Sequence, residues 1–243
     1  MDPKENIILA LDVEHFEDAR RLVMEFRDYV GMFKVGKQLF THCGPKIIDF
    51  INMKNSKVFL DLKYHDIPNT VSKAVIEAAK LGVDMLNVHA SGGLTMMKES
   101  RLALANITKK LQIPRPKIIG VTVLTSIDDG ELKTMGINVT VKELTKNLAL
   151  LAKDAGLDGV VAGGEDIEMI REICGKDFVI VTPGVRIGDK KDDQKRTITP
   201  KDAIEKGASY IVLGRTLLEN HQPFILLEGI YKDILDALSH RQD

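Results

Sequence analysis

Short apolar runs recur along the chain at nearly even spacing. Eight runs, each three to six residues long, lie on average about 30 residues apart. They occupy residues 7–11, 32–35, 58–62, 85–88, 118–123, 160–162, 179–181 and 210–213. β-branched residues are frequent in them, and few polar residues interrupt them. This pattern is typical of strands that are buried on both faces, as in a parallel sheet.

The stretches between the runs carry helical periodicity. Apolar residues spaced three and four apart predict helices after the first, third and fifth runs. These stripes are Phe16, Ala19, Leu22, Val23, Phe26 and Val30; Val71, Ala74, Val75 and Ala78; and Val141, Leu144, Leu148, Leu151, Ala152 and Ala155. Gly82 and Gly156 follow two of the stripes, and a glycine there can adopt the left-handed conformation that ends a helix.

Alternating strands and helices of this number predict a (β/α)8 TIM barrel. No Pro/Gly/Ser-rich linker divides the sequence, so we expect residues 1–243 to form a single domain. An open, doubly wound sheet remains an alternative, because periodicity does not report ring closure. In both folds ligands bind at the carboxyl ends of the strands.

Charge and composition narrow the function classes. The 34 Lys and Arg residues balance 35 Asp and Glu residues, which gives a net charge of −1 and no basic footprint for nucleic acid. The apolar run at 7–11 is too short for a membrane span or a signal-peptide core, so we expect a cytoplasmic protein without a membrane partner. Cys43 and Cys174 stand outside any paired motif, which argues against a disulfide framework and a cysteine-based metal site.

Polar residues at the ends of the runs are the candidates for chemistry. A purely structural barrel also places polar residues there, to cap helices and meet water. The residues in question are Asp12, Lys34, Asp61, Lys63, Asn87, His89, Thr125, Ser126, Arg186 and Arg215.

The third run concentrates charge. Strand periodicity places Asp61 and Lys63 on one face, toward the barrel interior, and Lys34 on the neighbouring run can reach the same point. Asp66 follows shortly before the next helix. Because buried charges need partners, we expect two carboxylates and two ammonium groups to alternate at this strand mouth. A structural ion-pair network is the alternative.

The last two units have features of a phosphate site. In TIM barrels, phosphate often binds at the loops after the seventh and eighth strands. Gly214 permits close backbone approach, while Arg186 and Arg215 offer the planar fork that suits phosphate. Residues 187–196 are polar and charged, and they are either a solvated loop or a lid that closes over phosphate through Gln194.

One ten-residue segment is far more specific than these patterns. Residues 61–70, DLKYHDIPNT, resemble the signature of the orotidine 5′-phosphate decarboxylase family. Further matches follow in family order: LD at 11–12, FKVG at 33–36, VLTS at 123–126, TPGVR at 182–186, DQKR at 193–196 and LGR at 213–215.

The resemblance implies a cofactor-free decarboxylase on a TIM barrel, with no metal ion, acting on orotidine 5′-monophosphate. It implies that Lys63 delivers a proton to C6 of the pyrimidine and that Asp61 lies against the substrate carboxylate. Lys34 belongs to the same charge chain. A homodimer is implied too, in which Asp66 and Thr70 complete the partner's site.

The resemblance also implies how the substrate is bound. Asp12 and Lys34 contact the ribose hydroxyls, and Thr125 and Ser126 lie beside the pyrimidine. The phosphate is held by Arg186, Gln194, Gly214 and Arg215.

Two other function classes compete with this interpretation. Keto-gulonate phosphate decarboxylases and hexulose phosphate synthases share the Asp-x-Lys-x-x-Asp strand but bind magnesium. A phosphate-binding regulatory barrel would leave Asp61, Lys63 and Asp66 as an idle network. The roles of Tyr64, His65 and His89 stay open, because single histidines near a strand end are more often structural than catalytic.

Overall fold

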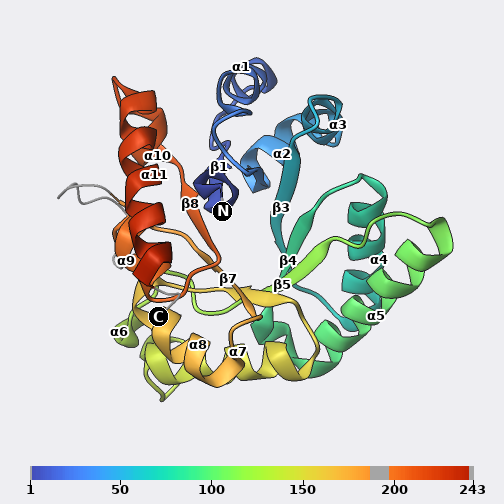
Figure 1. Cartoon of the computed structure of the whole chain (residues 1–243). Helices are drawn as coiled ribbons and strands as arrows, with labels where there is room; N and C mark the ends of the chain where they lie inside the picture. The colour runs from blue at the N-terminus through green and yellow to red at the C-terminus, as the bar shows by residue number, and fades with distance from the viewer. Residues whose placement is uncertain (1, 187–196, 241–243) are drawn as a thin grey trace.

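Eight parallel strands close into a barrel in the computed structural model, which describes residues 2–186 and 197–240 (Figure 1). Each strand pairs with the next one in sequence, and β8 pairs with β1. The strands are β1 (Ile7–Ala10), β2 (Met32–Gly36), β3 (Lys57–Tyr64), β4 (Met85–His89), β5 (Lys117–Val121), β6 (Gly159–Val161), β7 (Val179–Thr182) and β8 (Tyr210–Leu213). The predicted TIM barrel is confirmed, and the open-sheet alternative is excluded by the pairing of β8 with β1.

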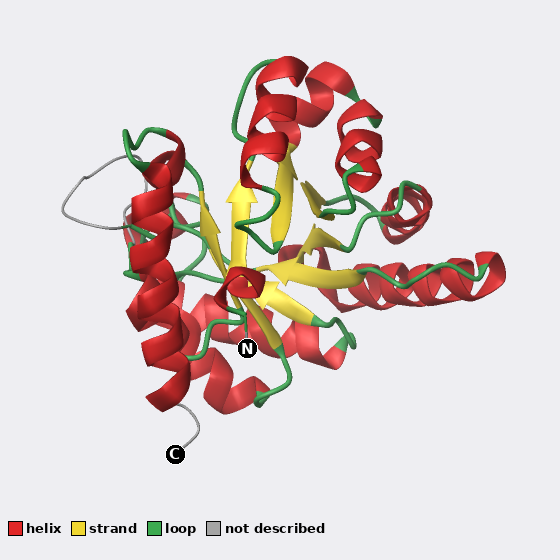
Figure 2. Cartoon of the chain, turned by 45° about the horizontal axis from the view of Figure 1, so that its top comes forward, coloured by secondary structure: helices red, strands yellow, loops and turns green. Residues whose placement is uncertain are grey.

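Helices surround the barrel on its outer side (Figure 2). The α-helices are α1 (Phe16–Phe26), α2 (Lys37–Cys43), α3 (Lys46–Met53), α4 (Pro68–Lys80), α5 (Gly93–Leu111), α6 (Asp129–Thr134), α7 (Val141–Asp154), α8 (Ile167–Cys174), α9 (Pro200–Glu205), α10 (Arg215–Leu218) and α11 (Pro223–His240). Short 3-10 helices are η1 (Pro3–Asn6), η2 (Ala90–Gly92) and η3 (Gly164–Asp166). Within the described ranges, no helix combines the length and apolarity needed to cross a bilayer.

The three predicted helical stripes are confirmed as α1, α4 and α7. Two stripes run past their helices: α1 ends at Phe26 while Val30 is buried in the turn that follows, and α7 ends at Asp154, one residue before Ala155. Gly82 and Gly156 have φ values of 74° and 75°, so both glycines take the left-handed conformation after their helices.

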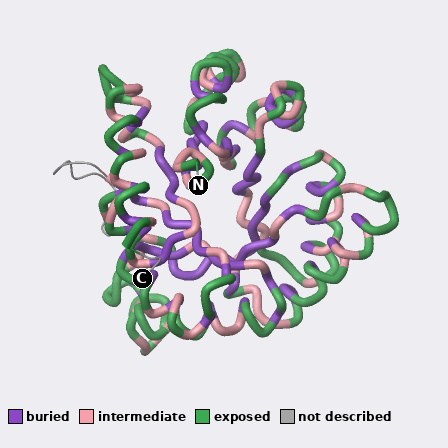
Figure 3. The backbone as a smooth tube through the Cα atoms, viewed as in Figure 1, coloured by how far each residue is buried: buried purple, intermediate pink, exposed green. Residues whose placement is uncertain are grey.

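The apolar core has two parts, one on each side of the strands. The larger part lies between the strands and the inner faces of the helices, where the buried segments in Figure 3 gather. The smaller part fills the barrel interior and consists of Ile8, Ala10, Met32, Phe59, Met85, Ile119, Val181 and Val212. This interior cluster closes the barrel from within, so polar side chains at the carboxyl ends of the strands rest on an apolar floor.

The third strand–helix unit turns sharply after its strand. Pro68 is the first residue of α4, where its missing N–H costs no helical hydrogen bond and its fixed φ suits the helix. Val71, Val75, Ala78 and Ala79 then bury the inner face of the helix. The short link between β3 and α4 brings residues 65–67 to the rim of the barrel.

Candidate active site

A cavity of about 300 Å³ opens at the carboxyl ends of the strands. Its floor includes Ala10, Phe59, Val121, Val161, Val181 and Val212. Its polar lining brings together nine of the site residues predicted from the sequence: Asp12, Lys34, Asp61, Lys63, Thr125, Ser126, Arg186, Gly214 and Arg215. Residues more than 200 positions apart in the chain therefore share one cavity.

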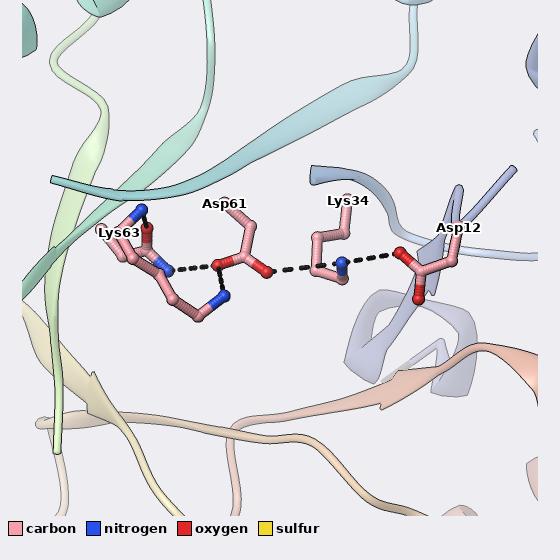
Figure 4. Close-up of polar contacts among 5 residues, drawn as sticks. Asp12, Lys34, Asp61 and Lys63 are labelled. Carbon is pink, nitrogen blue, oxygen red and sulfur yellow. Dashed lines mark hydrogen bonds and ion pairs between the residues drawn. The ribbon is translucent and has the colours of Figure 1, made fainter. Parts of the chain in front are cut away.

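Four charged side chains form a continuous row along one wall (Figure 4). Oδ1 of Asp12 lies 3.1 Å from Nζ of Lys34, which lies 3.3 Å from Oδ2 of Asp61. Oδ1 of Asp61 in turn accepts a hydrogen bond of 2.5 Å from Nζ of Lys63. We name Asp12, Lys34, Asp61 and Lys63 the charge row.

The alternation of charge sets the protonation of the middle of the row. Burial favours the neutral form of Lys34, but the charges of Asp61 and Asp12 outweigh burial and raise the pKa of Lys34. Burial likewise opposes ionisation of Asp61, yet Lys34 and Lys63 outweigh it and lower the pKa of Asp61. Both groups are therefore charged at neutral pH.

The pairing of β3 with β4 is irregular at the charge row. Leu60 pairs with Leu86, but the next pair is Tyr64 with Val88. Three residues of β3, at positions 61–63, thus stand opposite Asn87 alone. Lys63 has a φ of 51°, a left-handed conformation that is uncommon for residues other than glycine.

Asn87 is a site residue to which the sequence analysis gave no role. It is fully buried on β4, where its side-chain amide joins two members of the charge row. Its Oδ1 accepts the backbone N–H of Lys63 at 2.8 Å, and its Nδ2 donates to Oδ1 of Asp61 at 2.6 Å. The available signal was an asparagine two residues after Met85, a spacing that places both side chains on the interior face of the strand.

Asp66 and Thr70 lie apart from the cavity. Both are exposed and neither lines it. The Asp66 carboxylate accepts the backbone N–H of Ile67 at 2.6 Å. The expectation that Asp66 joins the charges at its own strand mouth is therefore wrong for the single chain. The chain turns outward after Tyr64, and Asp12, two residues after the end of β1, supplies the second carboxylate of the row.

The ends of β7 and β8 carry the predicted phosphate residues, which also line the cavity. Arg186 follows β7 and donates to Oγ1 of Thr216 at 2.9 Å. Gly214 and Arg215 follow β8, and Arg215 is exposed at the start of α10. Gln194 and the predicted lid at 187–196 lie outside the described residues.

Two histidines lie at the ends of the strands that carry Lys63 and Asn87: His65 follows β3, and His89 is the last residue of β4. The rings of His65 and His89 are 5.3 Å apart, and neither residue lines the cavity. Burial, together with nearby His65, Lys37 and Lys63, lowers the pKa of His89 to about 4. His89 is therefore neutral at physiological pH and is not poised to donate a proton there.

Among residues 2–186 and 197–240, no three His, Cys, Asp or Glu side chains are arranged to hold a metal ion. Cys43 and Cys174 are free thiols.

Comparison with known proteins assigns the chain to a family. A model described as the orotidine 5′-phosphate decarboxylase / HUMPS family matches residues 5–224. This chain belongs to that family.

Relatives within the family are similar over nearly their whole length. The orotidine 5′-phosphate decarboxylase of Geobacter sp. (strain M21) is 47% identical over 230 residues, which cover 94% of this chain and 95% of the relative. The orotidine 5′-phosphate decarboxylase of Syntrophus aciditrophicus (strain SB) is 45% identical over 240 residues, which cover 98% of this chain and 96% of the relative.

Solved structures support the same assignment. The crystal structure of orotidine 5′-phosphate decarboxylase from Lactobacillus acidophilus matches with a TM-score of 0.82 and 35% identity, covering 94% of this chain and 98% of that one. The crystal structure of orotidine 5′-phosphate decarboxylase from Pyrococcus horikoshii OT3 matches with a TM-score of 0.73 and 29% identity. The match covers 94% of this chain and 98% of that one. The family description covers two groups, and these four relatives carry the name of the decarboxylase.

Proposed function

We propose that this chain converts orotidine 5′-monophosphate to UMP and carbon dioxide, with Lys63 as the proton donor. This reaction is the final step of de novo pyrimidine nucleotide biosynthesis. The charge row carries the proposal: it lies above an apolar floor in a chain whose near-full-length relatives are named orotidine 5′-phosphate decarboxylases.

The proposal extends to the whole domain and its location. Residues 1–243 act as one catalytic domain, because the strands close one barrel and the family model spans residues 5–224. The enzyme acts in the cytoplasm, since a substrate with a phosphate and a carboxylate does not cross a membrane unaided.

The chemistry explains why a lysine is needed beside the reacting carbon. When carbon dioxide leaves C6, the electron pair stays in the plane of the ring, outside the π system, so the ring is a poor electron sink. Fixed positive charge beside C6 stabilises that pair without a cofactor or metal ion. The bond from C6 to the carboxyl group breaks, and C6 takes a proton from Nζ of Lys63. The neutral amine then regains a proton from water.

The rest of the charge row prepares Lys63 for this step. Asp61 lies against the substrate carboxylate and bonds the Lys63 ammonium at the same time. Lys34 balances Asp61 from the other side and, with Asp12, contacts the ribose hydroxyls. Because these charges are fixed before substrate binds, little reorganisation is needed during the reaction.

Other lining residues bind the parts of the nucleotide that do not react. Thr125 and Ser126 follow β5 and contact the pyrimidine, with Ser126 at its amide edge. Arg186, Gly214 and Arg215 hold the phosphate at the ends of β7 and β8, with Gln194 as a fourth contact. Binding energy from the distant phosphate can then be used to close the site and exclude water.

The proposed enzyme is a homodimer in which Asp66 and Thr70 complete the site of the partner. Their exposed positions outside the cavity of their own chain support this arrangement. Neighbouring Ile67 leaves 66% of its surface exposed, an apolar residue that a second subunit would cover.

Ultraviolet absorbance tests the proposed reaction directly, because orotidine 5′-monophosphate and UMP absorb differently. We expect the purified chain to decarboxylate the substrate at the same rate after dialysis against EDTA. Activity that EDTA removes and magnesium restores would favour a metal-dependent sugar-phosphate reaction. Nucleotide binding without turnover would favour a regulatory barrel.

A further inference from the structure

The irregular pairing of β3 and β4 leaves a structural problem that one side chain solves. Positions 61–63 stand opposite Asn87 alone, so the regular ladder of backbone hydrogen bonds is interrupted there. The backbone N–H of Lys63 loses its strand partner at this point, while its φ of 51° costs conformational energy. A contact from outside β3 must hold Lys63 in this conformation.

Asn87 supplies that contact and a second one. Its Oδ1 accepts the Lys63 N–H at 2.8 Å, in place of a backbone carbonyl. Its Nδ2 donates at 2.6 Å to Oδ1 of Asp61, the oxygen that also accepts from Nζ of Lys63. One amide thus bonds the backbone of the proton donor and the carboxylate that orients its ammonium.

The two bonds require both ends of an amide. A backbone N–H can only donate, so an acceptor must face Lys63. An ionised carboxylate can only accept, so a donor must face Asp61. The orientation of the Asn87 amide is therefore fixed, and among side chains of this length only a carboxamide offers one acceptor and one donor regardless of pH.

We propose that Asn87 is a positioning residue of the active site, one that holds the left-handed Lys63 backbone and the Asp61 carboxylate in register so that the Lys63 ammonium is aimed at the reacting carbon. The inference rests on the proposed decarboxylation. Asn87 acts through Asp61 and Lys63, because it is fully buried and does not line the cavity.

Two substitutions that keep the branch at Cγ separate the two bonds. Asn87→Leu removes both. Asn87→Asp keeps an acceptor for the Lys63 N–H, but at neutral pH it places a second carboxylate against Asp61. When protonated, the introduced carboxyl can again accept from Lys63 and donate to Asp61, which restores the original pattern.

A matched control comes from a buried hydrogen bond away from the site. Ser100 on α5 is fully buried and donates to the carbonyl oxygen of Met96 at 2.7 Å. Ser100→Ala therefore removes a buried bond without touching the charge row. We expect it to lower the melting temperature and leave kcat unchanged.

At pH 8 we expect Asn87→Leu and Asn87→Asp to lower kcat by between about tenfold and one-hundredfold, the range for losing a hydrogen bond to a charged group. The dissociation constant for UMP should change by less than about threefold, because binding contacts lie elsewhere in the cavity. Between pH 8 and pH 5, the Asn87→Asp deficit in kcat relative to wild type should shrink by about tenfold.

At each pH, kcat of Asn87→Asp is divided by kcat of wild type. The titration of groups that both proteins share then cancels. The groups nearest the substitution are Asp61 and Lys63 on β3, Lys34 beyond them on β2, and His65 and His89 at the ends of β3 and β4. His89 stays neutral throughout this pH range, since its pKa is lowered to about 4. A purely structural role would give a deficit that does not depend on pH.

Thermal unfolding provides a readout that does not require activity. Burial beside Asp61 raises the pKa of the introduced carboxyl, so its contribution to stability is lost as pH rises. The melting temperature of Asn87→Asp should therefore fall further below wild type at pH 8 than at pH 5. This comparison holds even if wild type fails to decarboxylate the substrate, an outcome that would overturn the proposed function alone.

The positioning role is contradicted if Asn87→Leu folds and keeps kcat within about threefold of wild type. It is also contradicted if the deficits of Asn87→Asp in kcat and in melting temperature are the same at pH 5 and pH 8. If Asn87→Leu does not fold, the pH dependence of kcat and melting temperature of Asn87→Asp tests the positioning role.

Discussion

The ten residues 61–70 present two pairs of polar side chains to different surroundings. Asp61 and Lys63 face the cavity of their own barrel, with side chains only 10% and 24% exposed and joined by a short ion pair. Asp66 and Thr70 do not line that cavity and are exposed. We call the first pair the inner half of the motif and the second pair the outer half.

The difference shows what each half needs in order to function. The inner half is complete within one chain, because Lys34, Asp12 and Asn87 already hold its charges. Within residues 2–186 and 197–240, the one side-chain hydrogen bond of the outer half is local, from the Ile67 N–H to the Asp66 carboxylate. A motif whose outer half acts on a site in a second subunit accounts for this division.

The largest effect is expected for Lys63→Ala. Because it removes both the proposed proton donor and the positive charge proposed to lie beside C6, we expect kcat to fall by at least about 10⁴-fold. The dissociation constant for UMP should change little. Lys80→Ala is a matched control, since Lys80 forms an exposed ion pair with Glu77 on the outer helix α4. Loss of turnover in both variants would contradict the assignment.

The next effect concerns the outer half. We expect Asp66→Ala and Asp66→Asn each to lower kcat by about 10²-fold, because in the proposed dimer each removes a charge from the partner's site. Asp66→Asn can still accept the Ile67 N–H, so it separates the charge from the local turn. If Asp66→Asn retained full activity, Asp66 would serve only to cap its own backbone.

A smaller effect, on KM rather than on kcat, is expected at the proposed phosphate site. Arg215→Ala removes a planar cation from the proposed phosphate contacts, so we expect KM to rise by between about tenfold and one-hundredfold. Its effect on kcat should be smaller than that of Lys63→Ala. An unchanged KM would mean that the phosphate site is wrongly placed.

The smallest effect is on stability. Asp61→Asn leaves Lys34 and Lys63 without their shared carboxylate, and we expect the melting temperature at pH 7 to fall by about 5 °C. Because folding lowers the pKa of Asp61, its contribution is full above the unfolded pKa of about 3.9 and is lost as pH falls through the lower folded pKa. The gap between wild type and variant should therefore be constant from pH 7 to pH 5 and shrink below about pH 4.

Much of the barrel could be predicted from local pattern. The eight β-branched runs became the eight strands, because a strand buried on both faces has little room for polar residues. The short helices α2, α6 and α10 were not predicted. Each has only one or two turns, so it carries no long apolar stripe.

The charge row could be predicted in part. Alternation along β3 placed Asp61 and Lys63 together, and the resemblance supplied the proposed roles. The irregular stretch at positions 61–63, opposite Asn87, depends on how β3 pairs with β4. No local pattern in β3 reports that pairing. Asp66 was placed at the wrong point for the same kind of reason, since strand spacing does not continue through the turn after Tyr64.

Subunit exchange between Lys63→Ala and Asp66→Ala tests most directly whether the two halves of the motif serve different sites. In a mixed dimer, one site combines the intact Lys63 of one chain with the intact Asp66 of the other, and the second site carries both defects. Random mixing of equal amounts makes half of the dimers mixed, so the account predicts that about a quarter of wild-type activity returns. Differently tagged chains show that exchange has taken place. Exchange without any recovery of activity would place Asp66 in the site of its own chain and contradict the division of the motif between two subunits.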